Sequence, residues 1–142
     1  MGFRADVRAA AVTLLSEYAV DAGVRLQVYP GRPRTINPPT AFVDNIREAR
    51  VFSGHLVQRT PTVEMIVLHG LFDAKDTAEQ GDAFVDGFLA WCDARYHAAG
   101  ASTLVGAVST EDLPSYVPDW LPPDQQRTYY ATQIDLEGFA TD

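Results

Sequence analysis

The sequence predicts an α+β fold in which a mostly antiparallel sheet carries two helices packed on one face. Two segments, roughly 3–22 and 76–99, show the helical spacing of apolar residues, and shorter extended segments lie between and after them. Only one helical segment separates strands, so a doubly wound parallel sheet, which alternates strands and helices, is not expected. The 142 residues fit one domain, which we place at 1–142.

The first helix is predicted by apolar residues three and four positions apart, namely Phe3, Val7, Ala11, Leu14 and Tyr18. Polar residues occupy its other faces. Gly23 follows at the position where a helix-terminating glycine is common, so we expect the helix to end there.

Short extended segments follow this helix. Residues 25–29 alternate polar and apolar side chains, prolines forbid regular structure across 30–39, and a second strand is predicted at 40–44. Residues 45–60 show no clear period, contain Gly54 and three arginines, and are interpreted as a basic loop with at most an edge strand near 49–52. The segment 62–69 is apolar on both faces and is therefore predicted to be a central strand.

The second helix is predicted to begin at Asp76, with Glu79 completing a capping box. Its buried stripe comprises Val85, Phe88, Leu89, Cys92 and Tyr96. Two further strands are expected at 103–110 and 127–136, joined by a connection over 113–123 that is rich in aromatic residues and prolines.

Charge is unevenly distributed along the chain. Residues 1–59 hold eight arginines against five acids, a balance of +3, whereas residues 60–142 hold three bases against fourteen acids, a balance of −11. A net charge of −8 is unsuited to gripping a phosphate backbone. The segregation is compatible with head-to-tail contact between copies of the chain, or with a solvated surface whose charges happen to separate.

No motif predicts catalysis. His55, His69 and His97 lack partners at metal-ligand spacing, and Cys92 lies on the apolar stripe of the second helix, where a core role is favoured. Nucleophile-elbow, phosphate-loop and dinucleotide-binding signatures do not occur, so we predict no enzyme activity, cofactor or metal. No apolar run is long enough to span a membrane, and the N-terminal residues lack a signal-peptide core, so an intracellular location is expected.

The candidate functional residues are instead candidates for protein contacts. Arg47, Arg50 and Arg59 lie in the basic segment and could meet acids on another protein, although simple solvation also accounts for them. Tyr116 and Trp120 in the second proline-rich connection are amphipathic residues of a kind enriched at interfaces. Trp120 could equally fold back onto its own core.

The order of these segments resembles the tail terminator proteins of long-tailed bacteriophages, also called minor tail or tail completion proteins. The resemblance covers nearly the whole chain as a pattern of elements, and is carried by Val28-Tyr29-Pro30-Gly31, Pro38-Pro39-Thr40-Ala41-Phe42-Val43, the strand from Pro61 to Val67, Asp82-Ala83-Phe84-Val85-Asp86-Gly87-Phe88, Ala107-Val108-Ser109, Pro118-Asp119-Trp120-Leu121-Pro122-Pro123 and Tyr129-Tyr130-Ala131-Thr132. None of these is a chemical signature.

The resemblance implies a structural virion protein. Such proteins form a ring, usually a homo-hexamer, that caps the tail tube, ends its polymerisation and meets the head-tail connector or stopper protein. Genome DNA would pass the lumen without specific binding, no membrane would be involved, and the protein would occupy the host cytoplasm during assembly and the tail or neck of the virion afterwards. The basic segment 45–60 would face the tube or a neighbour, and part of the acidic excess would line the lumen.

Two other hypotheses stay open at this level. One is a head-tail connector or head-completion ring protein of the same neck. The other is a small ligand-binding or enzymatic α+β domain with a pocket beneath residues 113–124, which requires a defined cavity with convergent polar groups.

Overall fold

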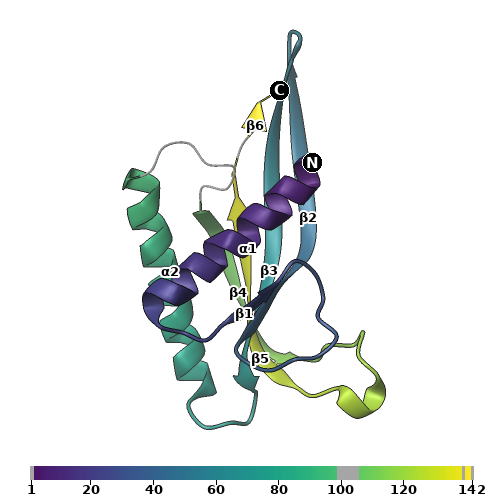
Figure 1. Cartoon of the computed structure of the whole chain (residues 1–142), viewed down its shortest axis with the longest axis vertical. Helices are drawn as coiled ribbons and strands as arrows, with labels where there is room; N and C mark the ends of the chain where they lie inside the picture. The colour runs from purple at the N-terminus through teal and green to yellow at the C-terminus, as the bar shows by residue number, and fades with distance from the viewer. Residues whose placement is uncertain (1, 99–105, 139, 142) are drawn as a thin grey trace.

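A computed structural model describes residues 2–98, 106–138 and 140–141 of the chain. The elements alternate as predicted between helices and groups of strands (Figure 1). In chain order they are α1 (Phe3–Ala22), β1 (Gln27–Tyr29), β2 (Thr40–Ser53), β3 (Leu56–Leu71), α2 (Thr77–Ala98), β4 (Gly106–Tyr116), the short 3₁₀ helix η1 (Pro123–Gln125), β5 (Tyr129–Glu137) and β6 (Ala140–Thr141).

The strands form one mostly antiparallel sheet in the order β1-β2-β3-β5-β4, with β6 pairing separately to β3. Only the pair β1–β2 is parallel, and the other described pairs are antiparallel. The prediction that residues 62–69 form a central strand is confirmed, because β3 lies between β2 and β5. The α+β fold class is confirmed as well.

Both helices pack on the same face of the sheet, which we call the helix face. The larger core cluster lies there and joins Val7, Leu15, Val63, Met65 and Phe88 with further apolar residues of α1, α2, β2 and β5. Cys92 belongs to this cluster and is 3% exposed, so the predicted core role of the cysteine is confirmed. Tyr96 and His97 belong to α2, but their side chains lie outside the described residues.

Among the residues that the structure describes, the opposite face of the sheet, which we call the open face, is covered only at one end. There a smaller core cluster contains Phe42, Ile66, Leu68, Tyr129 and Ala131. The segments 30–39 and 117–126 lie beside this end of the sheet (Figure 1). The rest of the open face carries polar side chains, described below.

The first helix is predicted correctly at both ends. It spans Phe3–Ala22, and Gly23 has a φ of +70°, the left-handed conformation that favours glycine at a helix end. The second helix begins at Thr77, but the predicted capping box is wrong. Asp76 has a φ of +66°, outside the extended region of an N-cap residue, and its side chain makes no hydrogen bond within the described residues.

The prediction of a basic loop at 45–60 is also wrong. β2 runs on to Ser53 and β3 starts at Leu56, and the two strands stay paired from Arg47 opposite Thr62 to Ser53 opposite Leu56. Gly54, with a φ of +62°, is the first of two turn residues, as in a type II′ hairpin. The two strands satisfy each other's backbone hydrogen bonds. The segment is therefore extended although its apolar residues do not alternate with polar ones.

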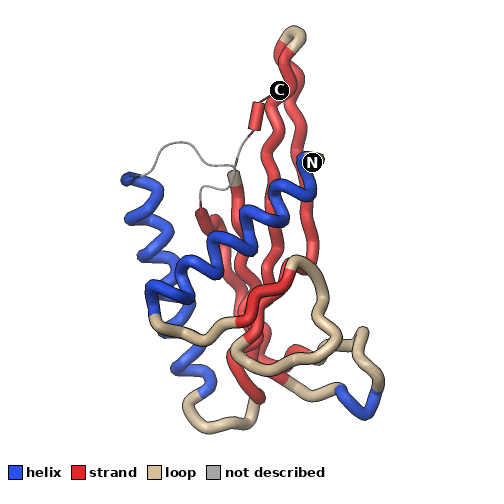
Figure 2. Tube along the Cα trace, viewed as in Figure 1, coloured by secondary structure: helices blue, strands red, loops and turns tan. Residues whose placement is uncertain are grey.

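This hairpin projects beyond the end of β5, and along this projection β3 pairs with β6 at Gln58 and Arg59. β5 ends at Glu137, which pairs with Thr62, whereas β2 and β3 continue past that point. At about 3.4 Å per residue, the six further residues of β2 carry the hairpin about 20 Å outward. Figure 2 shows this projection, which we call the arm (residues 47–62).

The last part of the chain differs from prediction in its strand boundaries. β5 spans Tyr129–Glu137 where 127–136 was predicted, and β6 was not predicted. β4 continues through Leu113 and Pro114 to Tyr116, residues that the sequence assigned to the connection. Proline is tolerated there because β4 is the edge strand of the sheet. Residues 103–105 of the predicted strand lie outside the described residues. None of the described helices is long and apolar enough to cross a membrane.

Candidate functional site

The arm ends in exposed apolar side chains on both faces, with Val51 and Leu56 on the open face and Phe52 on the helix face. Val51 is 56% exposed, Phe52 is 70% exposed and Leu56 is 45% exposed. The sequence analysis did not select these residues. The sequence does contain a feature that predicts this hairpin. Val51-Phe52 and Leu56-Val57 flank Ser53-Gly54-His55, and a glycine-containing turn between two apolar pairs is typical of a hairpin.

Arg50 and Arg59 lie directly opposite each other on the helix face of the arm. Arg59 forms an ion pair with Glu48, and its guanidinium lies 3.8 Å from the ring centre of Phe3 in α1. Arg50 is exposed and lies 5.4 Å from the ring centre of Phe52. Arg59 thus ties the arm to α1, whereas Arg50 remains at the surface near the tip.

The charges of this pair act on Glu48. The hydrogen bond from Arg59 and the positive charges of Arg59, Arg50 and Arg4 lower the pKa of the Glu48 carboxyl below its usual range, although partial burial opposes the shift. Glu48 is therefore a carboxylate at neutral pH, and it offsets the repulsion between the two opposed arginines.

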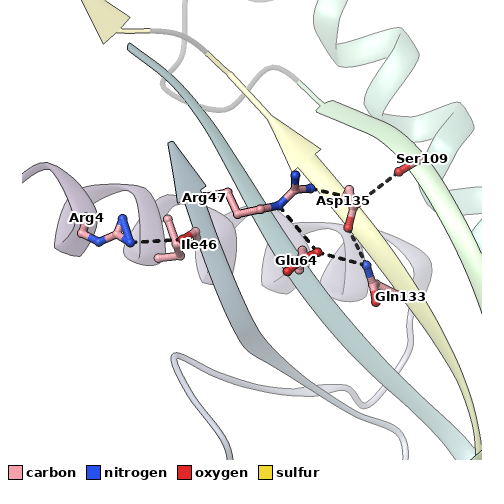
Figure 3. Close-up of polar contacts among 7 residues, drawn as sticks. All are labelled: Arg4, Ile46, Arg47, Glu64, Ser109, Gln133 and Asp135. Atoms are coloured by element: carbon pink, nitrogen blue, oxygen red, sulfur yellow. Dashed lines mark hydrogen bonds and ion pairs between the residues drawn. The ribbon is translucent and has the colours of Figure 1, made fainter. Parts of the chain in front are cut away.

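Arg47 belongs to the open face and joins a polar network on β3, β4 and β5 (Figure 3). Its guanidinium lies 3.7 Å from Glu64 Oε1 and 4.0 Å from Asp135 Oδ2. Gln133 donates to Asp135 Oδ1 at 3.0 Å and to Glu64 at 3.5 Å, and Ser109 donates to Asp135 Oδ2 at 2.9 Å. The structure thus separates Arg47 from Arg50 and Arg59, because alternate residues of a strand face opposite sides.

Carboxylates outnumber cations on this part of the open face. Four acids share it, as judged from strand register and contacts: Glu64, Glu111, Asp135 and Glu137. Arg47 lies above two of them and is 58% exposed, so water screens its attraction to them. The open face therefore presents a mainly negative surface.

Tyr116 and Trp120 lie near each other, with ring centres 6.4 Å apart, at the end of the sheet away from the arm. Trp120 packs edge to face on Phe42 with ring centres 5.2 Å apart, and its indole N–H donates to the carbonyl of Pro33 at 2.8 Å. The guanidinium of Arg32 lies 5.1 Å from the Trp120 ring centre. Trp120 is thus engaged with its own core, the arrangement that the sequence left open beside an interface role.

The environment of Tyr116 is consistent with this inward packing. Burial, reinforced by the charges of Asp44 and Asp119, raises the pKa of the Tyr116 hydroxyl to about 12, although Arg32 acts in the opposite direction. Tyr116 therefore stays neutral and packs against the smaller core cluster.

Among the histidines whose side chains are described, His69 is the one that makes a side-chain hydrogen bond and aromatic contacts. Its Nε2 lies 2.8 Å from Thr132 Oγ1, and its ring meets Phe84 edge to face at 5.8 Å. Gly81 leaves room for the ring, because a Cβ at that position would lie 2.7 Å from His69 Cδ2. Burial lowers the pKa of His69 to about 4, although the charge of Asp112 raises it in part. The neutral, half-buried ring thus serves as a packed, hydrogen-bonded element between β3 and α2.

Two surface hollows lie beside titratable side chains. One of about 440 Å³ lies beneath η1 and includes Asp124 and Arg127 in its lining. Arg127 Nη1 donates to the backbone carbonyls of Asp124 and Gln126. The other, of about 460 Å³, includes His69 and Gln80 among mostly apolar side chains. Within the described residues, no three His, Cys, Asp or Glu side chains gather closely enough to hold a metal ion.

Comparison with known proteins assigns no family. No protein-family model matches the chain, and the search of curated proteins returns no significant match.

Proposed function

We propose that this chain is a structural protein that assembles with copies of itself into a ring, and that the ring is a phage tail terminator. In this role it would cap the tail tube, end tube polymerisation and join the tail to the head-side connector. The observation that carries the proposal is the arm, which extends about 20 Å past the end of β5 and ends in exposed apolar residues.

An exposed apolar tip on a projecting hairpin is costly for an isolated monomer. Phe52 and Val51 leave more than half of their side-chain surface in water, and they add nothing to either core cluster. The exposed apolar side chains lie on both faces of the same hairpin tip, so a partner that surrounds the tip would bury all of them. The arm is therefore best explained as an element that is buried when the protein assembles.

The open face supports a ring with a polar lumen. Helices cover one face of the sheet, and the carboxylates Glu64, Glu111, Asp135 and Glu137 lie on the other. If the helices take the wider outer side of a ring, the acidic face lines the inside. Repulsion between these carboxylates and phosphates would let DNA pass without adhering.

The neighbouring hypothesis, a connector or head-completion ring, uses the same features. It differs in its partner, which would be the portal side of the neck and not the tube. The decisive experiment therefore includes the tube itself.

The proposal is tested by measuring solution mass by light scattering across a range of protein concentrations, with and without purified tail tubes. A tail terminator is expected to form a ring of about six copies, or to bind tube ends and stop their growth. A wild-type protein that stays monomeric at every concentration and ignores tubes would contradict the proposal. A ring that ignores tubes but binds a connector would favour the neighbouring hypothesis.

A matched pair of variants tests the arm. Phe52→Ser removes the most exposed side chain of the tip and should lower ring formation about tenfold or more, since interface aromatic residues often contribute over 1.4 kcal/mol. Val20→Ser changes a similarly exposed apolar residue, 79% exposed on α1, and should leave the ring intact. If both substitutions lowered ring formation equally, the arm would not be the element that is buried on assembly.

A further inference from the structure

Two edges of the sheet carry no strand partner within the described residues. β1 covers the outer side of β2 only as far as Phe42, and Arg4 of α1 then donates to the outward carbonyl of Ile46 at 3.1 Å. Beyond that point, residues 47–53 of β2 lie open on the outer side. At the other edge of the sheet, β4 pairs with β5 on one side only.

From these edges we infer that the outer edge of β2 in one copy pairs with the outer edge of β4 in a second copy, which continues the sheet from one protomer to the next. Open strand edges expose unpaired N–H and C=O groups, and they are templates for pairing with another strand. The inference rests on the proposed ring, because it assigns the contact between neighbouring protomers.

The charges of the two edges select this combination. The free segment of β2 carries Arg47 and Arg50, whereas β4 carries Glu111 and Asp112. Pairing β2 with β2 would bring arginines together, and pairing β4 with β4 would bring carboxylates together. Like charges on paired strands are destabilising. Pairing β2 with β4 places opposite charges together and joins copies head to tail, the arrangement that generates rings.

The direction of the strands follows from the topology. β2 and β4 run in opposite directions within the sheet, because three antiparallel steps separate them. If neighbouring copies keep their helices on the same side, β2 and the neighbour's β4 are therefore antiparallel. Arg47 then shares the open face with Glu111, and Arg50 shares the helix face with Asp112.

One register satisfies both faces. With Arg50 opposite Thr110 of the second copy, Arg50 lies diagonal to Asp112, and Arg47 lies diagonal to Glu111. Diagonal neighbours in a sheet are within reach of long side chains. The same register places Glu48 opposite Asp112, and the repulsion between them is reduced because Arg59 already pairs with Glu48.

Exposed apolar residues coincide in this register as well. Phe52 of the arm, 70% exposed, lies opposite Val108, which is 57% exposed in β4. Val108 lies at an irregularity in the pairing of β4 with β5, and Pro114 interrupts the regular register at the other end. These features confine regular pairing to the segment 109–113, which faces residues 47–51 of the arm.

Cross-linking tests the pairing directly. In the proposed register Val51 faces Ser109 of the next copy, at the Cβ spacing that a cross-strand disulfide requires. The double variant V51C/S109C, mixed with a mild oxidant, should give a ladder of linked chains up to the full ring. V51C alone, S109C alone and the control V20C/S109C should not, and the buried Cys92 does not compete.

A charge exchange gives an independent readout. Arg50→Glu and Asp112→Arg should each raise the dissociation constant of the ring about tenfold, and the double variant R50E/D112R should recover most of this loss. Circular dichroism and thermal unfolding of each variant confirm that the monomer still folds. Recovery in the double variant is the result that a merely structural effect of either residue would not give.

The outcomes separate this inference from the ring proposal. A wild-type ring whose cysteine variants assemble but form no ladder overturns the β2–β4 pairing and leaves the ring proposal standing. A ladder that forms to tube protein and not to a second copy also overturns the pairing. A wild-type protein that never assembles, alone or with tubes, overturns both.

Discussion

At the scale of single residues, His69 is the clearest case of a group whose environment decides its chemistry. It lies in β3 beneath α2, bonded to Thr132 and packed on Phe84, and burial lowers its pKa to about 4. In the unfolded chain a histidine has a pKa near 6.5. Between these values the unfolded chain binds the proton more readily, so protonation favours unfolding.

The contribution of His69 to the free energy of unfolding is therefore complete above pH 6.5 and is lost as the pH falls toward 4. The loss amounts to at most about 3 kcal/mol, at 1.36 kcal/mol per pH unit. Urea unfolding at pH 7, 5.5 and 4 should show a steeper loss for the wild type than for His69→Gln, whose amide can still bond Thr132. His55→Gln at the exposed hairpin turn is the control and should track the wild type. Parallel curves for the wild type and His69→Gln would contradict a neutral, buried His69.

At the scale of elements, the segment 117–126 shows how an aromatic side chain joins a loop to the sheet. Trp120 contacts Phe42 of β2, and it donates to the carbonyl of Pro33 in the other proline-rich segment. One side chain thereby holds two irregular segments against the open face of the sheet.

Removing this side chain should destabilise the monomer. Trp120→Ala is expected to lower the free energy of unfolding by about 2 kcal/mol, less than for a fully buried aromatic side chain, because Trp120 is partly buried. Trp120→Phe keeps a ring and should cost about 1 kcal/mol for the lost hydrogen bond. Val117→Ala, at a position that is 41% exposed in the same segment, should have little effect. Urea unfolding measures all three variants. A Trp120→Ala protein of unchanged stability that no longer assembles would instead identify Trp120 as an interface anchor.

At the scale of the whole molecule, charge is divided between the two free sheet edges. The free segment of β2 carries Arg47 and Arg50 against Glu48, and β4 carries Glu111 and Asp112. In a head-to-tail ring each protomer contributes one edge of each sign, so attraction between neighbours acts at every interface.

Assembly should therefore weaken with salt. Because the screening length falls from about 10 Å at 0.1 M to 3 Å at 1 M, the dissociation constant of the ring should rise steadily over this range. Light scattering at a series of salt concentrations measures the change. The R50E/D112R variant reverses one charge pair and should show a similar slope. A ring that tightens with added salt would show that the apolar tip, and not the charged edges, dominates the contact.

The fold class, the full extent of α1, the course of α2 and the central position of β3 were all predictable from the amino-acid sequence. Each of these elements packs against the core. The buried apolar residues therefore recur with a period of 3.6 residues in a helix and 2 residues in a strand. The apolar residues on both faces of 62–69 therefore predicted a strand covered on both sides, as the two core clusters around β3 show.

The features that support the proposed function depend on contacts between distant parts of the chain. The arm has solvent on much of its surface, so no burial period marks it, and its strands are specified by pairing with each other. The separation of Arg47 from Arg50 and Arg59 depends on strand register, and the inward course of Trp120 depends on contacts with Phe42 and Pro33. Local sequence records which side of an element is buried. It does not record which distant segment buries that side. The positions of the candidate interface residues depend on this long-range packing.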